Sequence, residues 1–368
     1  MTSAVDLAPL LDDPLVRRSV EVLKDGQGPS GAFVASPNFP TYHYAWLRDG
    51  AFCAHALDVA GESARAEMFH VWVVRSIETH RTMIEATIAR IAAGDPPSPE
   101  EMPPARYTLD GSLEQSEGEP WPNFQFDGYG MWLWALAEHL DRNGGSVEPW
   151  RASVELVARY LRSTWTLKSF SCWEELDGGE HAATLAATVA GLDSAARLLA
   201  QPAWADEAAR VRAELLGRFV HDGRFTRGPD DERVDGSLLW LGVPFGVVPL
   251  DDPRLERTVE TIRRDLYRPG GGVYRYLGDT YYGGGEWILL ACSLGWHEAR
   301  AGNLAAVEPI RAWVREQAEA NGDLPEQVAD HALTPEMLEP WLERWGPIAT
   351  PLLWSHAMYL IMEVEARI

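Results

Sequence analysis

Hydrophobic residues recur at helical spacing along most of this chain. Phe69, Trp72, Val73 and Ile77 lie three or four positions apart, as the apolar face of a helix requires. The same pattern predicts helices over 14–25, 52–61, 64–93, 129–143, 149–165, 181–200, 203–219, 253–267, 287–301, 304–321 and 354–365. No stretch reads convincingly as an alternating strand. The chain is therefore predicted to be all-α, with its helices in antiparallel pairs.

The longest and most aromatic loops recur after every second helix or so. The main ones span 28–42, 95–122, 269–285 and 324–351, and the second of them could hold a hairpin. Paired helices that repeat in this way must bury a face against their neighbours, which gives a solenoid or a closed ring. A ring of six hairpins would gather the loops at one end, around a pocket. Because no linker or composition shift divides the chain, we expect a single domain over residues 1–368.

The charge balance narrows the range of partners. Lys and Arg total 32 against 55 Asp and Glu, so the formal net charge is −23. This argues against nucleic acid and against anionic membrane surfaces, because both need clustered positive charge. A neutral substrate fits best. The 16 tryptophans fit both a helical core and a sugar site, where flat aromatic faces stack on pyranose rings.

Several features are expected to be absent. Cys53, Cys172 and Cys292 are odd in number and far apart, so they predict neither a disulfide framework nor a zinc site. We see no cluster of metal ligands and expect neither a metal nor a cofactor. Residues 1–14 lack the basic and apolar segments of a signal peptide, and no run approaches the roughly 18 apolar residues of a membrane span. We expect a cytoplasmic protein, either a monomer or a homodimer.

Two glutamates are candidates for acid–base chemistry. Glu174 follows Trp173 and precedes a second carboxylate, Glu175, and the turn-prone Asp177-Gly178. Desolvation beside a tryptophan can raise a carboxyl pKa and keep a proton available near neutral pH, as a general acid for a glycosidic oxygen needs. The best second carboxylate is Glu326, in the loop Leu324-Pro325-Glu326-Gln327. Taken alone, the Trp173-Glu174-Glu175 stretch fits a solvated loop end equally well.

Other polar pairs lie beside aromatic residues. Arg48 and Asp49 could together grip adjacent hydroxyls of one sugar. They could equally form an ion pair at a helix start, where the macrodipole favours an acid. Gln125 and Asp127 could act similarly or could cap a helix.

Read together, the loops resemble those of glycoside hydrolase family 15, the glucoamylase family. The matching stretches follow the order of the family from residue 42 to residue 356. They are Tyr44 to Asp49, Gln125 to Gly130, Trp173 to Glu175, Arg275-Tyr276 with Asp279 to Tyr282, Gly284 to Trp287, Leu324 to Gln327 and Leu353 to Ser355. One tetrapeptide alone would be weak evidence, but the ordered set is specific.

The resemblance implies an (α/α)6 barrel and an inverting hydrolysis that releases glucose from the non-reducing end of an α-glucoside. It makes Glu174 the general acid and Glu326 the general base. Arg48 and Asp49 become the clamp on the terminal glucose, Arg275 a second guanidinium on that sugar, and Glu175 a contact one subsite away. The remaining substrate-binding positions are Tyr44, Trp46, Gln125, Asp127, Trp173, Tyr281 and Trp354, with Trp46, Trp173, Tyr281 and Trp354 as walls. Glu286 stands where several relatives carry no acid, and its role stays open.

The sequence leaves the substrate open among several α-glucosides. We expect isomaltose to be preferred over α-1,4-linked malto-oligosaccharides, because long loops over 95–122 and 328–351 can wall off the subsites beyond the second glucose. Small bacterial members of the family also include isomaltose glucohydrolases. Trehalase activity and a phosphorylase are alternatives within the enzymes. A catalytically inactive sugar-binding or regulatory protein on the same fold is the alternative from another class.

Overall fold

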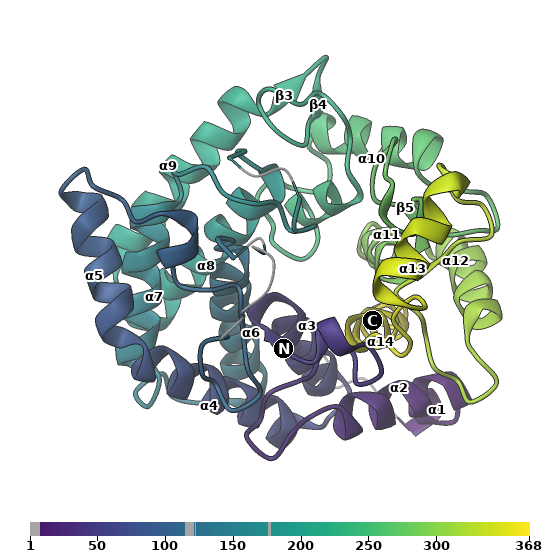
Figure 1. Cartoon of the computed structure of the whole chain (residues 1–368), viewed down its shortest axis with the longest axis horizontal. Helices are drawn as coiled ribbons and strands as arrows, with labels where there is room; N and C mark the ends of the chain where they lie inside the picture. The colour runs from purple at the N-terminus through teal and green to yellow at the C-terminus, as the bar shows by residue number, and fades with distance from the viewer. Residues whose placement is uncertain (1–7, 115–120, 122, 176–177) are drawn as a thin grey trace.

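The computed structural model describes residues 8–114, 121, 123–175 and 178–368. Its helices form a ring in which one layer surrounds another (Figure 1). Each inner element packs against the next and the last packs against the first. The inner elements are α3 (Leu47–Val59), α6 (Asp127–Asn143), α8 (Ala182–Leu199), the 3-10 helix η3 (Gly236–Leu241), α11 (Ile288–Arg300) and α14 (Leu353–Glu365). The expected (α/α)6 barrel is confirmed, although a short 3-10 helix takes one inner position.

The outer layer alternates with the inner one along the chain. The outer helices are α2 (Pro14–Asp25), α4 (Ser63–Thr79), α7 (Arg151–Thr164), α9 (Pro202–Arg218), α10 (Pro253–Asp265) and α12 (Leu304–Gln317). Each outer helix packs against the inner element that precedes it in the chain, except α2, which packs against the last inner helix, α14. Three further helices lie outside this alternation, namely α1 (Ala8–Leu11), α5 (Arg81–Ala92) and α13 (Leu338–Trp345).

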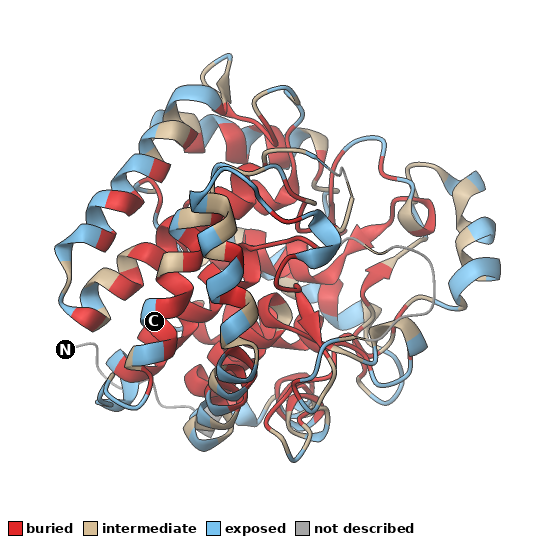
Figure 2. Ribbon diagram, turned by 60° about the vertical axis from the view of Figure 1, so that its left-hand side comes forward, coloured by how far each residue is buried: buried red, intermediate tan, exposed pale blue. Residues whose placement is uncertain are grey.

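The two layers differ in how much of each helix is buried (Figure 2). Every residue of α14 is buried, whereas α10 buries a single face that includes Leu255, Val259 and Ile262. This is the pattern expected when the inner helices form the core and the outer ones cover it. Gly130 and Gly191 let α6 and α8 approach closely, because a Cβ on Gly191 would lie 2.7 Å from the Cα of Gly130.

The predicted helix over 64–93 is wrong as a single element. The structure has two helices, α4 and α5, which meet at His80. The His80 ring bonds to the carbonyl oxygen of Gly111 at 3.0 Å and stacks on Tyr107. These contacts to a distant loop hold His80 at a backbone conformation outside the helix (φ −103, ψ 15) and redirect the chain. Apolar spacing cannot reveal such a break, because it continues on both sides.

The long loops contain more structure than predicted. The segment 324–351, taken as a loop, carries α13 and the 3-10 helix η5 (Pro335–Met337), while η1 (Pro40–Tyr42), η2 (Pro99–Glu101) and η4 (Tyr281–Gly283) lie in other loops. Two-residue strands join the loops to each other. In antiparallel pairs, β1 (Ala45–Trp46) joins β2 (Arg106–Tyr107), β3 (Val220–His221) joins β4 (Arg224–Phe225), and β6 (Glu286–Trp287) joins both β5 (Val273–Tyr274) and β7 (Gln327–Val328).

The hairpin considered for 95–122 is not the pairing that the described residues make. Strand β2 pairs with β1, which lies about sixty residues earlier in the chain. Residues 115–120 and 122 lie outside the described part, as do 1–7, where a signal peptide was not expected, and Asp177 of the predicted turn. The three cysteines are free and buried. In the part of the chain that the structure describes, no helix is long and apolar enough to cross a membrane.

Candidate active site

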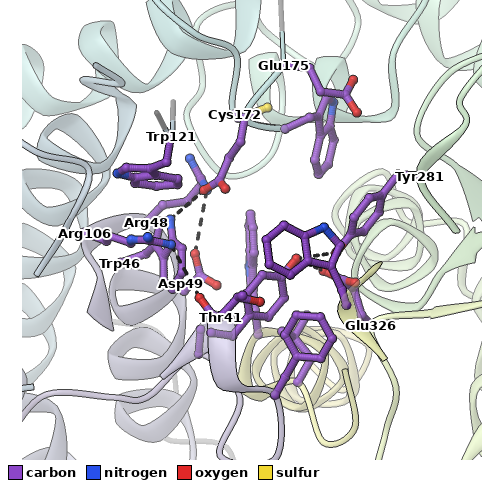
Figure 3. Close-up of a pocket in the computed structure, with 18 of the residues that line it drawn as sticks. Thr41, Trp46, Arg48, Asp49, Arg106, Trp121, Cys172, Glu175, Tyr281 and Glu326 are labelled. Atoms are coloured by element: carbon purple, nitrogen blue, oxygen red, sulfur yellow. Dashed lines mark hydrogen bonds and ion pairs between the residues drawn. The ribbon is translucent and has the colours of Figure 1, made fainter. Parts of the chain in front are cut away.

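A cavity of about 600 Å³ lies at the end of the ring where α3, α11 and α14 begin. Its size is typical of small-molecule sites. In Figure 3, Trp46 and Arg48 lie on one side of the cavity, and Tyr281 and Glu326 lie on the other. The lining residues are Ala35, Phe39, Thr41, Tyr42, Trp46, Arg48, Asp49, Arg106, Glu114, Trp121, Cys172, Trp173, Glu174, Glu175, Arg275, Tyr281, Trp287, Glu326, Trp341, Arg344, Trp345, Leu352 and Trp354.

Glu174 is held in an unusual conformation at the wall of this cavity. Its φ of +63° lies in the left-handed region, which costs a non-glycine residue free energy and is found most often at functional sites. The indole Nε1 of Trp46 donates to its Oε1 at 2.6 Å, and Arg48 Nη2 lies 3.4 Å from the same oxygen. Burial raises the pKa of Glu174 above its ordinary value, although Arg48 acts in the opposite direction. A carboxyl with a raised pKa and a fixed position can serve as a proton donor.

Arg48 sits in the first turn of α3 and is almost fully buried. Its Nη1 donates to Gln125 Oε1 at 2.8 Å and to Asp127 Oδ2 at 3.0 Å, while its Nε lies 3.7 Å from Asp49 Oδ2. Gln125 and Asp127 therefore fix the guanidinium from behind. Burial raises the pKa of Asp49 to about 7, even though Arg48 lowers it.

Glu326 lies in the loop just before β7 and is 3% exposed. Its backbone is fixed by bonds from its N–H to the carbonyl of Ala349 (2.9 Å) and from the N–H of Ile288 to its own carbonyl (3.3 Å). The Tyr42 hydroxyl donates to Oε1 at 3.0 Å and lies 2.7 Å from the Tyr281 hydroxyl. Among the described residues, Oε2 has no hydrogen-bond partner. One carboxylate oxygen is therefore fixed by a hydrogen bond, and the other is buried without one.

The pKa of Glu326 is also raised. Burial moves it to about 8, and the hydrogen bond from Tyr42 is the main opposing influence. The nearby acids Asp49 and Glu174 add to the burial effect on Glu326.

A second buried arginine, Arg275, lines the cavity close to Glu175. It is bonded to Asp279 through Nε (2.7 Å) and Nη2 (2.5 Å), and Nη2 also donates to Glu175 Oε1 at 2.8 Å. The hydroxyl of Tyr276 donates to the other oxygen of Glu175. Glu175 is thus held away from Glu174 by an arginine and a tyrosine, so the two adjacent acids are in different environments.

The mouth of the cavity is aromatic and more exposed. The Arg106 guanidinium lies 3.6 Å from the ring centre of Trp121 and pairs with Glu114 at 2.7 Å. On another side, α13 contributes Trp341 and Trp345, of which Trp345 is 37% exposed. The lining therefore runs from nearly inaccessible charged groups to exposed aromatic rings. Such a cavity can hold one sugar ring deeply and stack a second ring near the surface.

The matching family model is that of glycosyl hydrolases family 15, and it covers residues 14–335 of this chain. The chain belongs to glycosyl hydrolase family 15. An isomaltose glucohydrolase from Kribbella flavida is 41% identical over 358 residues, which are 95% of this chain and 92% of that protein. The chain is therefore an α-glucoside hydrolase of this family.

Solved structures of family 15 proteins agree in fold. A glycosidase solved as a point variant in complex with glucose is 41% identical, with a TM-score of 0.92 and 98% of both chains covered. A bacterial glucoamylase complexed with acarbose gives a TM-score of 0.76 at 20% identity, over 99% of this chain and 57% of that one. At that identity the second likeness concerns the fold alone.

The cavity brings together ten of the thirteen predicted site residues. Tyr44, Gln125 and Asp127 do not line it. Gln125 and Asp127 bind Arg48 from behind, and the Tyr44 ring packs against Arg106 and the edge of Trp46. The ten lining residues are Trp46, Arg48, Asp49, Trp173, Glu174, Glu175, Arg275, Tyr281, Glu326 and Trp354.

Several residues that line this cavity were not predicted from the sequence. Tyr42 was part of the loop considered, but its contact with Glu326 spans 284 positions and has no local signal. Trp341, Arg344 and Trp345 were hidden because α13 was not predicted.

Glu286, whose role the sequence left open, lies behind the cavity wall. It is fully buried, accepts a bond from the N–H of Gly272 at 2.9 Å and pairs with Arg268 at 3.4 Å and His331 at 3.0 Å. Its neighbour Trp287 lines the cavity. Glu286 therefore connects the loops on either side of β6 and supports that wall from behind.

Proposed function

We propose that this family 15 enzyme is an inverting, exo-acting hydrolase that releases β-glucose from the non-reducing end of short α-glucosides, preferably isomaltose. The observation that carries the proposal is the placement of Glu174 and Glu326 in one cavity. Glu174 is bound by Trp46 and Arg48 on one side, and Glu326 lies on the other (Figure 3). Inversion needs an acid on one face of the scissile bond and a base on the opposite face.

In this mechanism Glu174 enters the reaction protonated. Its proton passes to the glycosidic oxygen as the bond from that oxygen to the anomeric carbon breaks. Burial of the carboxyl favours this role, because it raises the pKa of Glu174 and keeps the acid form populated. The bond from Trp46 and the left-handed backbone fix the direction in which the proton is presented.

Glu326 reacts in its ionised form and removes a proton from water, and because burial raises its pKa to about 8, this form is the minor one at neutral pH. The water oxygen attacks the anomeric carbon from the side opposite the leaving group, so one bond forms and one breaks, and the product is β-glucose. Tyr42 holds Oε1, which leaves Oε2 to accept the proton. The two carboxyls must be roughly 6.5–9.5 Å apart for water to fit, and this separation remains a prediction.

Two features support exo action on a terminal glucose. Arg48 and Arg275 are 4% and 2% exposed, so the charged groups able to bind sugar hydroxyls lie at the deep end of the cavity. Asp127 and Asp279, each at most 1% exposed, hold these guanidinium groups in place. A pre-oriented, buried clamp of this kind favours one ring in one orientation.

The preference for isomaltose rests on the 41% identity to an isomaltose glucohydrolase and on the aromatic residues at the mouth of the cavity. Trp121 stacked with Arg106, and Trp341 and Trp345 on α13, border the region beyond the first ring. Aromatic rings on both sides would accept a second glucose and obstruct longer chains.

A panel of isomaltose, maltose, trehalose, isomaltotriose and soluble starch tests the proposal, with released glucose as the readout. We expect the highest kcat/KM on isomaltose, with efficiency falling as the chain lengthens. Efficiency that rises with length on α-1,4 substrates would instead indicate a glucoamylase. Formation of glucose 1-phosphate on addition of phosphate would indicate a phosphorylase, and no turnover of any sugar would indicate a binding protein.

A further inference from the structure

Three potential metal ligands meet inside the barrel, away from the active-site cavity. Asp58 is near the end of α3, His70 is in the middle of α4, and His139 is near the end of α6. One ligand atom from each lies within 4.8 Å of the other two, and all three residues are buried. Among the described residues this is the only such group of three or more. None of its members belongs to the proposed mechanism.

The cluster lies at the far end of the helices that carry the sugar clamp. Asp49 and Asp58 are nine residues apart on α3, or about 13 Å at 1.5 Å per residue. Asp127 and His139 are twelve residues apart on α6, or about 18 Å. The cluster is therefore separate from the proposed catalytic groups and joins three helices at the opposite end of the ring.

His70 is the member of the cluster that makes no hydrogen bond among the described residues. It is fully buried, and neither ring nitrogen has a hydrogen-bond partner among the described residues. Buried polar groups are otherwise nearly always satisfied, because an unpaired one loses its bonds to water. A ring nitrogen of His70 nevertheless faces the other two ligands, within the same 4.8 Å.

The other two members are held in place by hydrogen bonds. His139 Nδ1 lies 2.8 and 3.0 Å from the two oxygens of Asp58. The amide of Asn143 donates to Asp58 Oδ1 at 3.1 Å, so the carboxylate is also held from the surface side. Outer groups that fix the ligands in this way are typical of metal sites.

We propose that Asp58, His70 and His139 bind one divalent transition-metal ion, with Zn²⁺ the best match to two imidazoles and a carboxylate. Metal-bound imidazoles are neutral, so two of them and one carboxylate give the Zn²⁺ site a net charge of +1. Ligand atoms around tetrahedral Zn²⁺ are about 3.3 Å apart, given bond lengths of about 2.0–2.1 Å. The ligands therefore need to converge by roughly 1.5 Å at most, which side-chain rotation can supply. The bound ion would connect α3, α4 and α6.

Titration of the full-length protein with metal tests the proposal. The protein is stripped with a chelator, dialysed, and titrated with ZnCl₂ by calorimetry and with CoCl₂ by visible absorption. We expect one tight equivalent of Zn²⁺ per chain, the strong visible bands of four-coordinate Co²⁺, and a melting temperature several degrees higher with Zn²⁺. Absence of a tight equivalent, or only the weak bands of six-coordinate Co²⁺, would overturn the proposal.

A matched pair of variants assigns the ion to these residues. His70→Phe keeps an aromatic ring but removes the ligand that has no other partner. The control is His55→Phe, since His55 is also a buried histidine with an unpaired nitrogen but lies outside the cluster, between Trp134 and Trp296. We expect His70→Phe to weaken Zn²⁺ binding at least tenfold and to lose the thermal shift, while His55→Phe retains both. Equal binding by the two variants would overturn the assignment, and the wild-type cobalt spectrum remains decisive if His70→Phe does not fold.

Discussion

Trp46→Phe should shift the alkaline limb of the pH–activity profile to higher pH. The indole N–H of Trp46 lies 2.6 Å from Glu174 Oε1 and lowers the pKa of that carboxyl. Phenylalanine keeps an aromatic ring at the cavity wall and removes the donor. Because Glu174 must be protonated to act as the acid, a higher pKa keeps the enzyme active to higher pH.

The size of the shift follows from the strength of the bond. A hydrogen bond to a charged group contributes about 1.5–3 kcal/mol, and one to a neutral group about 0.5–1.5 kcal/mol. The difference of about 1–1.5 kcal/mol acts on the ionised form alone. Since one pKa unit corresponds to 1.36 kcal/mol, the alkaline limb should rise by about one pH unit. Arg48 is unchanged in the variant and still lowers the pKa of Glu174, which limits the shift of the alkaline limb.

The assay measures kcat/KM on isomaltose across the pH range for wild type, Trp46→Phe and a control. Trp354→Phe is the control, because Trp354 lines the same cavity and its indole N–H has no partner among the described residues. It should change kcat/KM but not the position of the limb. If Trp46→Phe leaves the limb within about 0.3 units of wild type, either Trp46 does not tune the acid or Glu174 is not the acid.

Three further variants test other parts of the site. Tyr42→Phe removes the bond that lowers the pKa of Glu326, so the acidic limb should move to higher pH, and an unmoved limb would argue against Glu326 as the base. Glu326→Gln keeps shape and bonding capacity but cannot take a proton, so activity should fall by about 10²-fold or more with glucose binding retained. More than a tenth of wild-type activity would exclude this role. Glu286→Gln weakens the ion pairs with Arg268 and His331, so the free energy of unfolding should fall by about 1–3 kcal/mol in thermal unfolding. An unchanged melting temperature would contradict the supporting role of Glu286 behind the cavity wall.

The pattern of apolar residues predicted most of the fold because the outer helices follow it closely. Helix α10 buries Leu255, Val259 and Ile262 at the expected spacing, and the predicted range over 253–267 differs from the observed one by two residues. Helix α4 ends early for a reason that local spacing does not contain, the contacts of His80 with Gly111 and Tyr107. Helix α13 was not predicted, because the whole segment 324–351 was assigned to a loop.

Site residues could be predicted where their immediate sequence neighbours indicate a site. Glu174 beside Trp173, and Arg48 beside Asp49, could be found because adjacent residues of these types suggest a site. Tyr42 and Asp58 could not, because their partners come from distant segments that only the fold brings together. Gln125, predicted to bind substrate, accepts a hydrogen bond from Arg48 and does not line the cavity, a position that depends on depth within the barrel rather than on local sequence.

The central claim is that Glu174 and Glu326 hydrolyse an α-glucoside with inversion. Proton NMR of the anomeric signals during the first minutes of isomaltose hydrolysis tests it most directly, before mutarotation mixes the two forms. The reducing unit contributes glucose in its existing α/β ratio, so the account predicts that the initial excess over that ratio is β-glucose and that this excess declines as mutarotation proceeds. Initial release of α-glucose from the non-reducing unit would contradict the assignment of Glu326 as the base that activates water.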